Sequence, residues 1–319
     1  MPKTTAKMTQ PAETPEKAPA PSLPIAPNSQ VKITVPWTTV DPAYQKALRR
    51  YARDVKIDGF RKGKAPLHLV EGMVKQTALI EYVLQVILPD AYAAVIQAED
   101  KHPISQPEVD PVKIDKGSDW ELIAYFAETP EIKLTKYDEA VKKGIQEAEQ
   151  EIATQEKTLQ ENTAEQLTEK TQPINLTAEQ KDELKTRFIF KQLVELFNPQ
   201  IPELLVRREA DRELRRLVEQ LEQHKLSVER YLESRQMDAE QLRLEYLSAA
   251  VTSLQLEFIL AEIGKAEKIT VDEKEIDDTL DRVFGEKLSD TQRQNNEYRS
   301  YVFSSVVKQK IAKHLLSLA

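Results

Sequence analysis

The sequence predicts an α+β domain, a small sheet packed on helices, followed by an all-α domain. Two segments, 31–37 and 120–126, alternate apolar and polar residues as half-buried strands do, and they flank stretches with apolar residues at helical spacing. After residue 176 only the helical spacing is found. The 319 residues include 7 glycines, and this low content favours long helices over tight turns.

The first domain is expected to begin with the strand 31–37, where Pro36 suits an edge position because proline has no amide hydrogen to donate. Asp41 is expected to cap a helix with Pro42 at its first position. This helix carries apolar residues on one face and ends before Gly59. The pattern therefore predicts a strand followed by an amphipathic helix.

Pro66 is expected to open a second helix after a loop rich in glycine and lysine. Segment 79–96 is apolar almost all round, which predicts a central core helix that Pro89 kinks or breaks. Two more strands are expected at 104–109 and 120–126. The first domain is thus a small sheet with helices, and a helix–loop–helix tip projects from it.

Segment 138–172 differs in composition, because Glu, Gln, Lys and Thr dominate it. Its apolar residues step by four, three, four and seven in a thin stripe typical of a coiled coil: Val141, Ile145, Ala148, Ile152 and Leu159. As a helix, this segment would span about 40–50 Å at 1.5 Å per residue. The sequence leaves a helical spacer and a partly disordered spacer both open.

Capping signals mark the helices of the second domain. A capping box is expected at Thr177 with Gln180, and another at Asp238 with Gln241. Ser227 is expected to start a short helix between them. The expected division of the chain is a tail at 1–29, the α+β domain at 30–137, a charged helical linker at 138–175 and the helical domain at 176–319.

The N-terminal segment 1–29 is rich in Pro, Ala and Thr and poor in bulky apolar residues. Such a segment cannot offset the entropy of ordering, so it is expected to be a disordered tail, and deletion of residues 1–28 is expected to be harmless. It also lacks the apolar core of a signal peptide. No run approaches the ~18 consecutive apolar residues of a membrane span, so a cytoplasmic protein without membrane contact is expected.

The charge of the chain is asymmetric, and this points to a polyanion as a partner. The net charge is −8, yet residues 1–66 hold 12 Lys and Arg against 5 Asp and Glu. Most of the excess lies on the expected first helix and the loop after it: Lys46, Arg49, Arg50, Arg53, Lys56, Arg61, Lys62 and Lys64. A localised basic patch on an acidic protein suits contact with RNA; taken alone, it would more often be a solvated helix face.

Catalytic chemistry finds no support in the motifs. The chain has no cysteine and four scattered histidines, and no Ser lies in a GxSxG sequence. The loop at 59–65 resembles a phosphate-binding loop, but it is one residue short and carries Ala65 where Ser or Thr would bind magnesium. We therefore expect a non-enzymatic binding protein with no metal and no cofactor, which works without ATP.

The loop is better explained as a docking tip. Phe60 lies between Gly59 and Arg61, where burial within its own domain is difficult, and an exposed aromatic beside cations suits a surface of protein and RNA. The alternative is an ordinary turn whose Phe60 folds back on the helices. The residues expected to form the tip are Gly59, Phe60, Arg61, Lys62, Gly63, Lys64 and Pro66, and those expected to support it are Lys46, Arg49, Arg50, Arg53 and Lys56.

Segment 55–66, Val-Lys-Ile-Asp-Gly-Phe-Arg-Lys-Gly-Lys-Ala-Pro, resembles the ribosome-docking signature of the bacterial trigger factor family. Weaker similarity continues at 120–130 and at 201–205. The resemblance implies that Phe60, Arg61 and Lys62 contact the large ribosomal subunit, protein and rRNA, near the exit tunnel. It implies an ATP-independent chaperone that holds nascent and unfolded polypeptides. Client-contacting residues and the oligomeric state, a homodimer included, stay open.

One feature of that family is expected to be missing. Its members usually carry an FKBP-type prolyl isomerase domain with an aromatic-lined pocket, whereas residues 131–174 here contain one Gly, one Tyr and no Phe or Trp. Isomerase activity is therefore not expected. Two alternatives are kept: a helical holdase or adaptor that works away from the ribosome, and, less favoured, a prolyl isomerase with a degenerate site.

Overall fold

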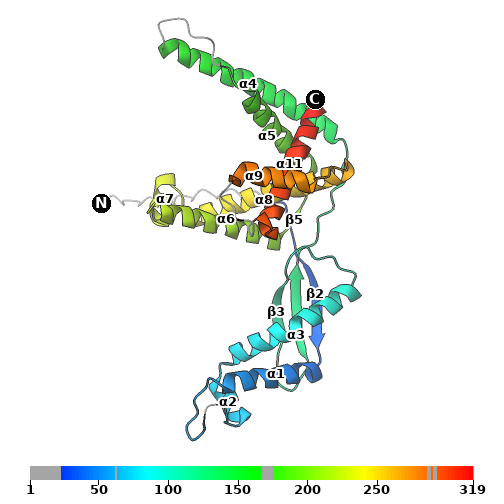
Figure 1. The fold of residues 1–319 in the computed structure, drawn as a ribbon, viewed down its shortest axis with the longest axis vertical. Helices are drawn as coiled ribbons and strands as arrows, with labels where there is room; N and C mark the ends of the chain where they lie inside the picture. Colours follow the sequence, from blue (N-terminus) through cyan, green and yellow to red (C-terminus); the bar gives the residue numbers. More distant parts are fainter. Residues whose placement is uncertain (1–22, 62, 167–174, 286–288, 290–292, 319) are drawn as a thin grey trace, which may run out of the picture.

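The computed structural model describes residues 23–61, 63–166, 175–285, 289 and 293–318. The described chain forms a small α+β domain joined by a narrow neck to a larger helical domain (Figure 1). The predicted fold class is thereby confirmed. In Figure 1 the tip of the α+β domain lies at its far end from the helical domain, with the sheet between them.

The α+β domain is built on a three-stranded antiparallel sheet. Its strand order is β2 (Ser29–Val35), β4 (Trp120–Phe126) and β3 (Glu108–Lys113), so β2 and β3 are the edges. Alternate residues of the central strand are buried, as the sequence pattern predicts: Trp120, Leu122, Ala124 and Phe126. They form one core with alternate residues of β2 and with the helices that cover this face.

Three helices complete this domain: α1 (Trp37–Ala52), α2 (Leu67–Met73) and α3 (Gln76–Ala98). Helix α3 packs on the sheet and α1 packs on α3, and both contribute apolar residues at helical spacing to the core, among them Tyr44, Leu48, Leu79 and Val83. Helix α2 is short and buries Val70 completely. The tip connects α1 to α2, so its two ends rest on the core.

Three expected element boundaries were wrong: those of strand β2, which ends at Val35 and leaves Pro36 at the N-cap of α1, of helix α1 and of strand β3. Helix α1 begins at Trp37, not after Asp41, since the Trp37 amide donates to Asp119 Oδ1 at 2.8 Å across the β3–β4 turn. This distant cap leaves Pro42 inside the helix. Strand β3 lies four residues beyond the expected 104–109; it is an edge strand, so Pro111 is tolerated there.

Pro89 does not end helix α3, which continues to Ala98. Apolar residues before and after the proline pack on the same core, including Ile87 and Val95. This packing outweighs the loss of one backbone hydrogen bond, which proline otherwise makes unfavourable inside a helix. The expected break is therefore absent.

Segment 138–172, left open by the sequence, forms helix α4 (Tyr137–Gln166) in the part that the structure describes. It packs against α5 (Ala178–Phe197), and the two helices project together from the domain (Figure 1). The two helices approach closely at Gly144, where a Cβ atom, if one were present, would lie 2.7 Å from Ile189 Cα. The charged segment, in its described part, thus forms a hairpin with α5 that shares the core of the helical domain.

The rest of the helical domain comprises α6 (Glu203–Gln223), α7 (Val228–Arg235), α8 (Ala239–Ala266), α9 (Glu273–Phe284) and α11 (Asn296–Ser317). The capping boxes at Thr177 and Asp238 are confirmed, since each side chain accepts from the amide three residues on and Gln180 or Gln241 reciprocates. Ser227 likewise caps α7.

The end of the predicted tail belongs to the fold. Strand β1 (Ile25–Ala26) pairs in parallel with β5 (Ile201–Pro202), which directly precedes α6. The expectation of disorder was therefore wrong for residues 23–29, and residues 1–22 lie outside the described part. The pairing partner lies more than 170 residues away, so no local sequence pattern could indicate it.

Helices α3 and α8 are long and apolar enough, by length and composition alone, to cross a membrane. The same test is passed by core helices of folded domains. Each of the two contributes buried side chains to a protein core, such as Val83 and Ile259. The two helices therefore carry no argument for a membrane span.

Candidate functional site

The tip between α1 and α2 is a loop closed by its own backbone. The Gly63 amide donates to Ala52 O at 3.0 Å, which ties the loop back to the end of α1. Turns on either side are closed by Phe60 N to Ile57 O at 3.1 Å and by Lys64 N to Arg61 O at 2.9 Å. These bonds close the described part of the loop through its own backbone.

Both glycines of the tip have backbone angles that other residues rarely adopt. Gly59 has φ +85° and Gly63 has φ +77°, both in the left-handed region. A Cβ atom at Gly59 would meet nothing within 4 Å, so the backbone angle and not the space explains this glycine. The backbone of the tip therefore turns at two glycines, both of them among the residues expected to form it.

Phe60 is 43% exposed and belongs to none of the buried clusters. The alternative that it folds back into the core therefore finds no support. Arg61 and Lys64 are exposed beside it, whereas Lys62 lies outside the described residues. An exposed aromatic ring flanked by cations can enter an apolar pocket while the cations reach nearby phosphates.

The basic residues expected to support the tip form an exposed face along α1 and the start of the loop. All five are exposed: Lys46, Arg49, Arg50, Arg53 and Lys56. Within the described part of the chain, none of them lies within 4 Å of a carboxylate, whereas Lys32 on β2 and Lys116 in the β3–β4 turn are paired with Glu121 and Glu71. Their charge is therefore free to attract a polyanion.

A polar network holds α2 in place beneath the tip, and sequence reasoning missed it. The Tyr44 hydroxyl on α1 donates to Glu71 Oε1 at 2.8 Å, and Lys116 Nζ from the β3–β4 turn lies 2.7 Å from both Glu71 oxygens. The Lys116 and Tyr44 hydrogen bonds lower the pKa of Glu71. Burial, and then the bond to Glu71, raises the pKa of Tyr44 to about 12.

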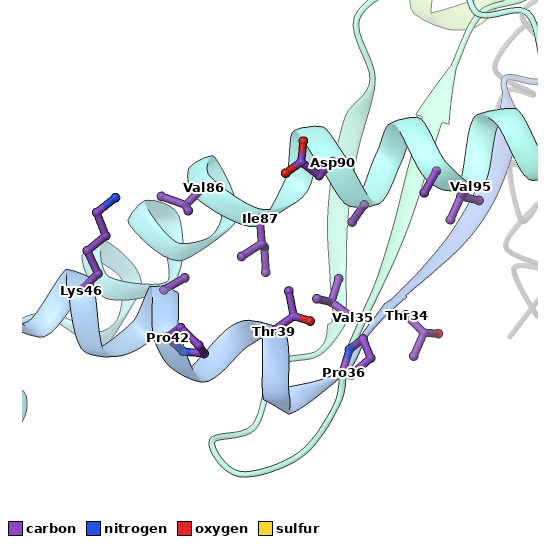
Figure 2. Close-up of a pocket in the computed structure, with 13 residues that line it drawn as sticks. Thr34, Val35, Pro36, Thr39, Pro42, Lys46, Val86, Ile87, Asp90 and Val95 are labelled. Carbon is purple, nitrogen blue, oxygen red and sulfur yellow. The ribbon is translucent and has the colours of Figure 1, made fainter.

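An apolar cleft of about 590 Å³ lies between α1, α3 and the end of β2 (Figure 2). Val35, Pro42, Val86 and Ile87 face into it, and Lys46 stands at one end of it. Its polar groups do not converge as catalytic groups would. In the described residues, no group of three His, Asp or Glu side chains is placed to hold a metal ion.

A second hollow, of about 750 Å³, lies in the helical domain between α5 and α8. Its lining includes the apolar side chains of Phe190, Val194 and Leu256 and the charged side chains of Arg187 and Lys191. Apolar surface beside charged groups is typical of sites that bind other polypeptides. Helices α5 and α8 lie on the other side of the neck from the tip (Figure 1).

Comparison with known proteins identifies the family. The family model described as bacterial trigger factor protein (TF) matches residues 25–160, and the one described as bacterial trigger factor protein (TF) C-terminus matches residues 157–317. The chain belongs to the trigger factor family. Because the two matches adjoin, no segment lies between them that could form the isomerase domain, and this form of trigger factor lacks it.

Relatives in the trigger factor family support this assignment. Trigger factor of Mycobacteroides abscessus is 35% identical over 105 residues, 33% of this chain and 21% of the relative. Trigger factor of Staphylococcus aureus is 35% identical over 129 residues, 40% of this chain and 29% of the relative. The matched part of the chain is thus less than a third of the length of these relatives.

A solved structure shares the fold. It was reported under the description "Promiscuous Substrate Recognition in Folding and Assembly Activities of the Trigger Factor Chaperone". The likeness has a TM-score of 0.50 at 13% sequence identity and covers 90% of this chain and 96% of that one. Membership in the trigger factor family supports a chaperone function.

Proposed function

We propose that this protein is an ATP-independent chaperone of the cytoplasm that docks on the ribosome and holds nascent or unfolded polypeptides. The docking residues are Gly59, Phe60, Arg61, Lys62, Gly63, Lys64 and Pro66, with the exposed basic face of α1 as support. The observation that carries the proposal is the tip itself: Phe60 is exposed between cations on a loop whose shape its own backbone fixes. Family membership favours the same interpretation.

The proposed division of labour follows the two ends of the molecule. The α+β domain, residues 30–137, would bind the ribosome, and the helical domain, residues 176–319 with the preceding charged segment 138–175, would hold clients. The hollow between α5 and α8 supports the second role, because apolar segments of unfolded chains can be shielded there. Two sites on one chain raise the effective concentration of chaperone near the client.

The decisive experiment is co-sedimentation with bacterial ribosomes at two salt concentrations. A triple variant with Phe60→Ala, Arg61→Ala and Lys62→Ala should lose at least about tenfold in affinity, since each lost contact to a charged group is worth roughly 1.5–3 kcal/mol. The salt dependence should also weaken, by about one unit of the log–log slope for each cation that contacts phosphate.

A matched control removes an exposed aromatic and two cations elsewhere: Tyr301→Ala, Lys308→Ala and Lys313→Ala on α11. This variant should bind ribosomes as the wild type does. Equal loss in both variants would mean that general charge, and not the tip, causes the binding. No binding by the wild type would refute docking and favour a holdase that works away from the ribosome.

Independence from ATP is tested on a client that aggregates during refolding. Aggregation should be suppressed to the same extent with and without nucleotide, because the tip loop lacks the spacing and the hydroxyl residue of a phosphate-binding loop. A requirement for ATP would contradict this part of the proposal. Catalysed refolding of a proline-limited substrate would contradict the expected absence of isomerase activity.

A further inference from the structure

The segment just before the sheet, residues 23–28, is bound to the helical domain by its backbone. Ile25 and Ala26 pair with Ile201 and Pro202, and the Ile201 amide donates to Pro24 O at 3.0 Å. These contacts place the segment at the start of α6. A stretch that the sequence assigns to a dispensable tail therefore lies against the domain at the other end of the chain.

Asn28 gives α6 the cap that its own sequence lacks. The residue at the N-cap position of α6 is Pro202, which makes no side-chain cap. Asn28 Oδ1 instead accepts a hydrogen bond from the Leu204 amide at 2.7 Å. The first amides of a helix have no partners within the helix, so a cap from elsewhere in the chain stabilises it.

Side chains of the segment complete an apolar core of the helical domain. Leu23 and Ile25 pack against the buried cluster of Ile201, Val206, Ala210, Ala250 and Val251 from β5, α6 and α8. Apolar residues contributed from outside a domain are as effective as its own residues in excluding water from the core. Removal of the segment would therefore uncover part of this core.

The connection from this segment to the sheet has almost no slack. Pro27 and Asn28 alone separate β1 from β2, and the ring of Pro27 fixes one of the backbone angles. The Ser29 hydroxyl at the start of β2 donates to Glu128 Oε2 at 2.5 Å. Glu128 lies where the chain leaves β4 for the helical domain. The two chain segments that pass through the neck are therefore hydrogen-bonded to each other.

A separate contact joins the edge of the sheet to the same helix. Glu108 on β3 forms an ion pair with Arg207 on α6, and its Oε1 atom lies 3.6 Å from Nη2 of Arg208 on the same helix. Strand β3 and residues 23–28 thus reach α6 from different parts of the α+β domain. Two attachments at separate points restrict rotation between two bodies in a way that one flexible linker cannot.

We propose that residues 23–28 form a strap that holds the helical domain in one orientation relative to the tip, assisted by the Glu108–Arg207 pair. The strap is a β-strand addition within one chain, with backbone pairing, a side-chain cap and two apolar anchors. Its effect is to keep the client-binding end at a fixed offset from the docking end. The strap fixes this orientation regardless of which surface the tip contacts.

The test compares two shortened chains by the distance between two spin labels. The protein has no cysteine, so Gln85→Cys on α3 and Gln220→Cys on α6, both exposed, provide the only two labelling sites. The full chain and a chain that begins at residue 23 should give the same narrow distance distribution. A chain that begins at residue 29 should give a distribution at least about twice as broad.

A milder variant covers the case in which the shorter chain fails to fold. Asn28→Ala combined with Glu108→Gln removes the cap and the ion pair but leaves the apolar anchors, and it should give an intermediate width with unchanged helix content by circular dichroism. An unchanged distribution in this variant, or in a folded chain that begins at residue 29, would overturn the proposal. Ribosome binding through the tip is measured separately, so failure of docking and failure of the strap are distinguishable.

Discussion

Gly144 offers the sharpest test of the packing between α4 and α5. A Cβ atom at this position would lie 2.7 Å from Ile189 Cα and 2.8 Å from Ile189 N. Ordinary contacts are about 1 Å longer, and the obstacle is helix backbone, which cannot rotate away as a side chain can. In Gly144→Ala the two helices must therefore separate, or one must bend.

The magnitude follows from two opposing effects. Ala stabilises a helix interior by about 1 kcal/mol relative to Gly. Overpacking costs about 1–3 kcal/mol in general, and a backbone contact this short belongs at the upper end. The expected net loss in the free energy of unfolding is about 2 kcal/mol, measured by urea denaturation followed by circular dichroism.

Two other helical glycines are matched controls. At Gly72 in α2 a Cβ atom would meet nothing within 4 Å, so Gly72→Ala should be neutral or stabilising by up to about 1 kcal/mol. Gly264 in α8 would meet only the end of the Ile311 side chain, at 3.2 Å, so Gly264→Ala should fall between the two. If Gly144→Ala were as stable as Gly72→Ala, the close approach of α4 and α5 would be refuted.

Three further predictions concern the tip and its base. Glu71→Gln should weaken ribosome binding without loss of fold. It should also flatten the pH dependence of stability in an acid titration. The lowered pKa of Glu71 contributes stability that is present above the ordinary pKa of 4.5 and is lost as the pH falls below that value. The raised pKa of Tyr44 predicts a second loss of stability as the pH rises from about 10 to about 12, and this loss should be absent in Tyr44→Phe. Gly63→Ala should cost about 1–2 kcal/mol because its φ is +77°, and a variant as stable as the wild type would contradict the closed loop.

The parts of the fold that the sequence predicted are those set by local patterns. The alternation in β4, the capping boxes at Thr177 and Asp238, and the short helix after Ser227 each depend on residues within a few positions of one another. Errors arose where a distant residue decides, as Asp119 does for the start of α1. The placement of α4 also depends on a distant surface, that of α5.

The candidate site divides in the same way. Gly59, Gly63 and the exposed Phe60 could be predicted because the tip is one continuous segment with its own turn chemistry. Glu71 and Lys116 could not, since they meet Tyr44 only through the folded sheet and helices. A lysine in a turn and a glutamate on a short helix carry no sequence signal that they belong together.

The pairing of β1 with β5 also sets an order of events during synthesis. Asn28 and Leu204, which it caps, are 176 positions apart in the chain. The sheet and its helices use residues 31–126 and can fold as soon as these have left the ribosome, but Leu23 and Ile25 find their partners only after α6 and α8 have been made. The first apolar residues of the described chain are thus among the last to be buried, so the protein itself passes through a stage at which its own N-terminal segment needs shielding.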